Sequence, residues 1–122
     1  MISRRRERVQ RLLRDRVSQV IIHEIADPRR GFVTVTRAEV SPDLREAKVF
    51  VSIIGTESEI KTTFRGLEHA GGFVQRRVGD GMGMKNTPRI RFVLDDSVKK
   101  SVRISALLRQ ISEEKGDEPD ET

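Results

Sequence analysis

Arginine is the residue with the clearest chemistry in this chain, and it is concentrated in two places. The first is the N-terminal stretch, which carries Arg4, Arg5, Arg6, Arg8, Arg11, Arg14 and Arg16. The second surrounds Ala70-Gly71-Gly72, with Arg65 on one side and Arg76 and Arg77 on the other. Guanidinium groups hold phosphate oxygens through paired, charge-assisted hydrogen bonds. Both places therefore predict the binding of a phosphate-bearing polyanion.

The glycine pair interrupts a run that otherwise predicts helix on both sides. A glycine inside a helix costs roughly 1 kcal/mol relative to alanine. Adjacent glycines therefore indicate either a bend or a bare backbone that a ligand approaches closely. The arginines on both sides favour a phosphate as that ligand. An ordinary turn between two helices explains the local pattern equally well.

The charge distribution favours nucleic acid as the polyanion. The 122 residues have a formal net charge of +5, and six of the last ten residues are acidic while one is basic. The preceding part is therefore more basic than the whole chain, and its bases are clustered, which is typical of nucleic-acid-binding surfaces. We expect residues 1–112 to form one domain and residues 113–122 to be a disordered acidic tail.

Composition disfavours several other classes of protein. The chain has no cysteine, which excludes disulfides and thiolate metal sites. No stretch approaches the roughly 20 apolar residues of a membrane span, and the first residues do not resemble a signal peptide. We expect a cytoplasmic monomer that binds no membrane, no small-molecule substrate, no metal and no cofactor.

Hydrophobic periodicity predicts the elements that must position the arginines. An apolar stripe with helical spacing predicts an amphipathic helix over residues 3–25. Alternation predicts strands over 32–40 and 44–54, which the short turn between them joins as an antiparallel hairpin. Thr56 and Glu59 have the spacing of a capping box and begin the helix that runs to the glycine pair and resumes beyond it.

The remaining residues complete a small α+β domain. A glycine-rich loop is expected over 79–88, a strand over 89–95, and a last helix beginning at Asp96 or Ser97. The predicted order is α-β-β-α-break-α-β-α. It favours a three-stranded sheet with the helices on one face.

That order, with a bend between two helices before the final strand, resembles the type II KH-like fold. KH domains clamp nucleic acid with a GxxG loop at the bend, whereas this chain has Ala70-Gly71-Gly72, which resembles the Ala-x-Gly kink of the bacterial ribosome-binding factor A family. Residues 27–36 are similar to the helix-to-strand segment of that family, 40–52 to its hairpin and 88–95 to its final strand. The resemblance spans roughly residues 5–112.

The resemblance implies a non-enzymatic ribosome assembly factor. Such a factor would bind the immature small ribosomal subunit and its precursor rRNA near the start of the small-subunit rRNA. It would assist late rRNA folding and 5′-end processing, and the family is associated with growth at low temperature. One departure is that residues 81–85 keep a single base, Lys85, where the family usually has several.

Two alternatives from other classes stay open. A general KH-like RNA-binding protein would not be restricted to ribosomal precursors. An RNA-processing enzyme would use His69, which adjoins the glycine pair, as an acid or base, but the sequence shows no partners that would orient it. Phe50, on the polar face of its strand, is expected either to stack on a base or to lie under a helix.

The predicted RNA-binding residues combine the two arginine-rich places with bases on the hairpin and the connecting loops. They are Arg4, Arg5, Arg6, Arg8, Arg11, Arg29, Arg30, Arg45, Lys48, Ala70, Gly71, Gly72, Arg76, Arg77 and Lys85.

Overall fold

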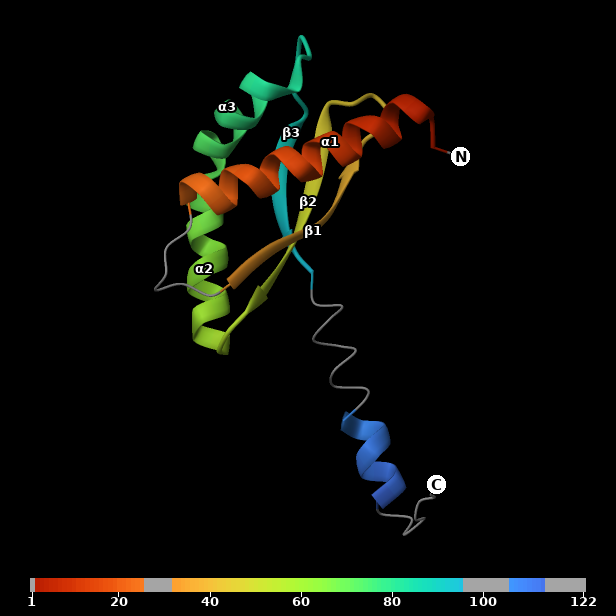
Figure 1. Cartoon of the computed structure of the whole chain (residues 1–122), viewed down its shortest axis with the longest axis vertical. Coiled ribbons are helices and arrows are strands. Elements are labelled where there is room, and N and C mark those ends of the chain that lie inside the picture. The colour runs from red at the N-terminus through yellow and green to blue at the C-terminus, as the bar shows by residue number, and fades with distance from the viewer. Residues whose placement is uncertain (1, 26–31, 96–105, 114–122) are drawn as a thin grey trace.

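The computed structural model describes residues 2–25, 32–95 and 106–113. Within them, the helices that precede the last strand lie against one face of a three-stranded sheet, as Figure 1 shows. The long helix α1 (Arg4–Val20) crosses the strands, and α2 (Glu57–His69) and α3 (Gly71–Met82) lie end to end beside it. The predicted α+β class and the predicted element order are confirmed, and α1, α2 and α3 lie on one face of the sheet as expected.

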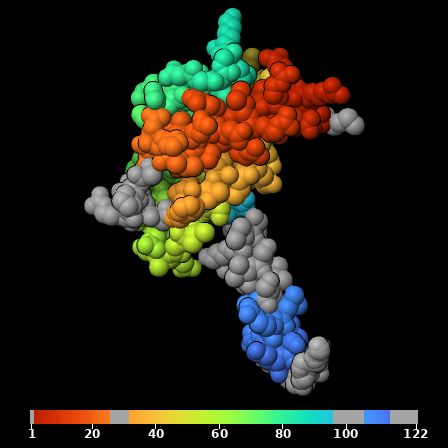
Figure 2. All heavy atoms as spheres, in the orientation of Figure 1, coloured from red at the N-terminus to blue at the C-terminus, as the bar shows by residue number. Residues whose placement is uncertain are grey.

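Helix α1 (Arg4–Val20) continues as one π-helical segment, η1 (Ile21–Ile25). Ser3 caps its first turn, since the Ser3 hydroxyl accepts a hydrogen bond from the Arg6 amide at 3.1 Å. One stripe of the helix is buried, at Val9, Leu13, Val17 and Val20. The arginines of the first half lie outside this stripe, and Arg4, Arg5, Arg8 and Arg11 are exposed. This half of the helix forms a free edge of the molecule in Figure 2.

The sheet has the order β1-β2-β3. Strands β1 (Phe32–Val40) and β2 (Glu46–Ile54) pair antiparallel, as predicted, while β3 (Arg89–Leu94) pairs parallel to β2. A parallel pair needs a long crossover, which α2 and α3 provide. Alternate residues of β2, namely Ala47, Val49, Val51 and Ile53, are buried beneath the helices.

Helices α2 (Glu57–His69) and α3 (Gly71–Met82) meet at Ala70, as the glycine-break interpretation predicts. Thr56 and Glu59 form the expected capping box at the start of α2. Ala70 leaves helical geometry with φ −82° and ψ 1°. The bend is therefore made by the alanine, and both glycines are already helical residues of α3.

The prediction of a loop over residues 79–88 was wrong in its first part, because α3 continues to Met82. Val74, Val78 and Met82 are all buried at helical spacing, and this packing outweighs the low helix propensity of the glycines between them. The helix ends at Gly83, whose φ of 66° lies in the left-handed region that glycine adopts without strain.

Two predicted segments, the last helix and the acidic tail, lie partly outside the described residues. The predicted beginning of the last helix, at Asp96 or Ser97, is not described. Residues 106–113 are helical with exposed side chains. Of the predicted acidic tail, residues 114–122 lie outside the description, so its disorder stays a prediction. Within the described helices, none is long and apolar enough to cross a membrane.

Candidate nucleic-acid interface

The hairpin turn between β1 and β2 positions Arg45. Leu44 adopts a left-handed φ of 61° there, and its amide donates to the Ser41 carbonyl at 2.8 Å. The Asp43 carboxylate accepts hydrogen bonds from the Ser41 hydroxyl at 2.7 Å and the Arg45 amide at 3.1 Å. The Ser41 hydrogen bond is the main reason that the pKa of Asp43 is lowered. The turn is thus well defined and leaves the Arg45 side chain exposed.

Three predicted bases from separate parts of the chain converge beside this turn. Arg5 of α1, Arg45 of the hairpin turn and Lys85 of the loop before β3 line one hollow of about 630 Å³. Gln75 of α3 fixes the end of that loop, because its side-chain amide donates to the Pro88 carbonyl at 2.9 Å and accepts from the Ile90 amide at 2.8 Å. Asp43 is the acidic residue that lines the hollow.

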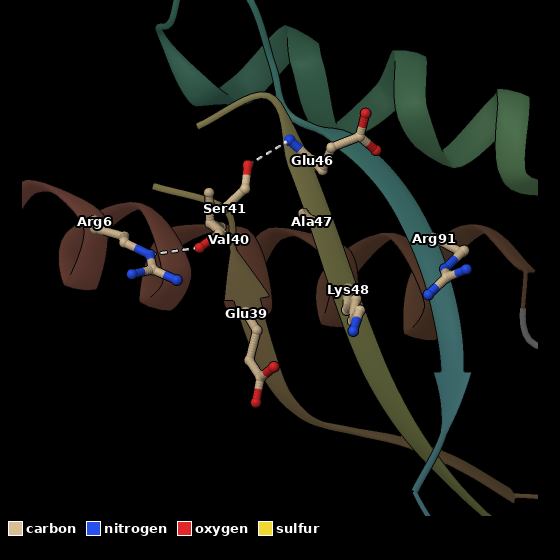
Figure 3. A pocket seen from close by; sticks show the side chains of 8 residues that line it. All are labelled: Arg6, Glu39, Val40, Ser41, Glu46, Ala47, Lys48 and Arg91. Carbon is tan, nitrogen blue, oxygen red and sulfur yellow. Dashed lines mark hydrogen bonds between the residues drawn. The ribbon is translucent and has the colours of Figure 1, made fainter. Parts of the chain in front are cut away.

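A second hollow, of about 350 Å³, opens beside the first and is drawn in Figure 3. Its bases are Arg6 of α1, Lys48 of β2 and Arg91 of β3, with Glu39 and Glu46 also in its lining. The Arg6 Nε donates to the Val40 carbonyl at 2.5 Å, which holds the guanidinium at the end of β1.

Arg11 lines a third hollow, of about 230 Å³, together with Arg14 and Arg37. Arg4 and Arg8 are exposed on the same half of α1. The predicted bases on the N-terminal half of α1 thus lie near the predicted bases of the hairpin turn and of the loop before β3. We call this set the basic band, which consists of Arg4, Arg5, Arg6, Arg8, Arg11, Arg45 and Lys85.

The α2–α3 junction forms a separate group at the other end of α1, as Figure 1 shows. Alanine offers no side-chain cap to α3, and the first turn of α3 has no acidic residue. A β-carbon added at Gly71 or Gly72 would meet nothing within 4 Å, and neither glycine has a left-handed φ. Packing and backbone geometry within the described residues thus do not require glycine at either position.

The two arginines after the glycine pair have different surroundings. The Arg77 Nε donates to the Glu24 carboxylate at 2.8 Å, so this guanidinium joins α3 to η1 within the fold. Arg76 is exposed and has no ion pair with another described residue. Arg76 is accordingly the better placed of the two to receive an external anion.

The structure divides the predicted site residues into three sets. The basic band is brought together, Lys48 lies on the adjoining sheet, and the junction residues with Arg76 and Arg77 lie apart. Arg29 and Arg30 fall outside the described residues. Sequence reasoning did not include Arg37, Arg89 and Arg91 among the site residues. All three lie on predicted strands, but alternation within one strand does not show which bases meet on the outer face of the folded sheet.

The enzyme alternative depends on the surroundings of His69. His69 is exposed in the last turn of α2, and none of the hydrogen bonds found between described residues orients its ring. Among the same residues, no three histidine, aspartate or glutamate side chains are grouped as metal ligands would be.

The fold and the surface together define a small α+β domain with a cationic edge. A sequence profile of the family described as Ribosome-binding factor A matches residues 5–108. Ribosome-binding factor A of Halothermothrix orenii is 43% identical over 121 residues, which cover 99% of each chain. The chain belongs to the ribosome-binding factor A family.

Solved structures agree on the fold. The crystal structure of ribosome-binding factor A from Thermus thermophilus superposes with a TM-score of 0.62 at 21% identity, covering 73% of this chain and 94% of that one. A homology model of Thermus thermophilus ribosome-binding factor A, fitted into the cryo-EM map of a 30S complex, has a TM-score of 0.60 at 22% identity, covering 70% and 89%.

Proposed function

We propose that this chain binds the immature small ribosomal subunit through its precursor rRNA, with the basic band as the main contact. The observation that carries the proposal is the convergence of Arg5, Arg45 and Lys85 from three separate elements on one hollow. Family membership supports the ribosomal partner, because a relative has been placed in a 30S complex.

The proposed mode is recognition of phosphates, not of base sequence. Lysine and arginine side chains neutralise backbone phosphates and release counterions, which makes affinity depend steeply on salt. If six to ten phosphates are neutralised, affinity falls roughly 10³- to 10⁵-fold between about 50 and 200 mM salt. A flat salt response would contradict this mode.

The α2–α3 junction is proposed as the second contact. Its glycines leave the backbone bare, and amides in the first turn of an uncapped helix favour an anion. Arg76 would add a charge beside them. The fold does not require glycine at positions 71 and 72. The close approach of a phosphate would require it.

We propose that the protein acts as a reversible, non-enzymatic brace during late maturation. It stabilises an incomplete rRNA conformation and leaves when the mature shape no longer fits, which requires different affinities for the two states. Processing of the rRNA 5′ end and growth in the cold would then benefit indirectly. An RNA-processing enzyme would instead lose activity in His69→Ala without losing affinity.

Sedimentation of a cell lysate through a sucrose gradient tests the ribosomal partner. We expect the wild-type protein to travel with small subunits and Arg45→Gln/Lys85→Gln to remain near the top. The control, Lys61→Gln/Arg109→Gln, removes two exposed charges outside the basic band and should sediment as wild type. Equal retention of both variants would contradict the basic band, and binding to all RNA without enrichment on small subunits would favour the general RNA-binding alternative.

A further inference from the structure

The sheet has a second face, opposite the helices, whose side chains are exposed or half-exposed in the described residues. Two cross-strand rows run over it. One row is Arg37, Phe50 and Val93, and the other is Glu39, Lys48 and Arg91. Figure 3 views the second row from this side, with α1 behind the strands. None of the described helices therefore covers Phe50, contrary to one of its two expected placements.

A β-bulge at Thr36 places Arg37 on this face. Val33 and Val35 pair opposite the core-facing residues of β2, and the register shifts between Val35 and Arg37, so that Arg37 pairs with Phe50. Bulges re-aim side chains in this way beside functional sites. The Arg37 guanidinium carbon lies 4.0 Å from the centre of the Phe50 ring, which is a cation–π contact.

Lys48 and Arg91 occupy directly adjacent positions on β2 and β3. Like charges opposite each other on neighbouring strands destabilise a sheet. Glu39 stands opposite Lys48 on β1 but its carboxylate lies 3.7 Å from Arg37, and Glu46 also lines the hollow. Neither Lys48 nor Arg91 forms an ion pair with a described residue. An external anion would relieve this repulsion.

We propose that this sheet face binds a short single-stranded segment of RNA. Bases would stack on the surface made by Phe50 and Arg37, and phosphates would lie between Lys48 and Arg91. Aromatic rings beside a cationic groove bind single strands in this way without reading sequence. The proposal rests on the proposed RNA-binding function and adds a site for unpaired RNA that adjoins the basic band, since Arg6 lines the same hollow as Lys48 and Arg91.

Fluorescence of a ten-nucleotide single-stranded RNA with a central 2-aminopurine tests the site on the full chain. The protein has no tryptophan or tyrosine, so quenching of the probe reports stacking against a low background. We expect wild-type protein to quench the probe. Phe50→Leu, which keeps an apolar side chain, should remove the quenching and weaken binding roughly 5- to 150-fold.

Charge variants separate this site from the rest of the surface. Lys48→Gln/Arg91→Gln should weaken binding of the oligonucleotide more than Lys61→Gln/Arg109→Gln and lower the salt slope by about 2. Circular dichroism melting confirms that each variant is folded. Unchanged quenching in Phe50→Leu, or equal effects of the two charge variants, would overturn the site.

Binding of a structured rRNA fragment shows whether only the single-strand site is wrong or whether the proposed function is wrong too. If Arg45→Gln/Lys85→Gln still weakens binding of the fragment while both sheet variants behave as controls, only the single-strand site is wrong. If that variant also binds the fragment normally, the RNA-binding role of the basic band is wrong as well.

Discussion

Alanine at the two junction glycines should stabilise the fold and weaken RNA binding at the same time. Neither Gly71 nor Gly72 has a left-handed φ, and an added β-carbon meets nothing within 4 Å. The substitution therefore gains helix propensity and lowers the entropy of the unfolded chain without strain. The opposite effect on RNA follows because the new methyl groups would occupy the space that a phosphate needs.

The structure sets the size of both effects. Each Gly→Ala change inside a helix contributes about 0.5–1 kcal/mol, and we take the lower value because both glycines lie in the first turn of α3. The double variant should gain about 1 kcal/mol, or roughly 4–8 °C in Tm for a domain of about 100 residues. Loss of one hydrogen bond to a charged phosphate, about 1.5–3 kcal/mol, weakens RNA binding roughly 10- to 150-fold.

Thermal melting and RNA titration of the same protein preparations give the two quantities. Thr62→Ala is the matched control, because Thr62 is exposed within α2 away from the junction. It should raise Tm by a similar amount through helix propensity and leave RNA affinity unchanged. A stabilised Gly71→Ala/Gly72→Ala protein with wild-type RNA affinity would refute the bare-backbone contact.

Three further predictions concern how the site is positioned. A β-carbon at Gly81 would overlap the Arg16 guanidinium, which donates to the Arg77 carbonyl at 3.4 Å. Gly81→Ala should therefore raise Tm more in an Arg16→Ala background than in wild type. The two changes should be coupled by about 0.5–3 kcal/mol in the free energy of unfolding. Additive effects of the two changes on that free energy would contradict the contact. Thr56→Ala removes the capping box and should cost about 0.5–2 kcal/mol in denaturant unfolding; an unchanged midpoint would count against it. Ser41→Ala should raise the pKa of the Asp43 carboxyl toward its ordinary value, measured by NMR titration, because the Ser41 hydroxyl is the main cause of the lowering. Since the folded pKa lies below the unfolded value of about 3.9, Asp43 contributes stability above that pH and loses it as pH falls through the folded pKa; an unshifted titration in the variant would contradict this.

Periodicity was sufficient to predict most of the fold. The alternation of Ala47, Val49, Val51 and Ile53 fixed the buried face of β2, and the spacing of Thr56 and Glu59 correctly marked the start of α2. Glycine content misled the prediction for residues 79–82, because the buried pair Val78 and Met82 was not given enough weight against local propensity.

The site was less accessible to sequence reasoning for a physical reason. Clustering of bases along one helix is visible in the chain, but the meeting of Arg5, Arg45 and Lys85 depends on the parallel crossover that brings β3 beside the hairpin turn. The Glu24–Arg77 ion pair and the bulge at Thr36 are likewise tertiary features. No pattern of single residues reveals them.

The affinity of the full chain for immature and mature small subunits, measured side by side at one salt concentration, tests the central claim most directly. The account predicts tighter binding to the immature subunit, and a loss of that binding in Arg45→Gln/Lys85→Gln but not in Lys61→Gln/Arg109→Gln. Equal affinity for the two subunits, or indifference to the charges of the basic band, would contradict it.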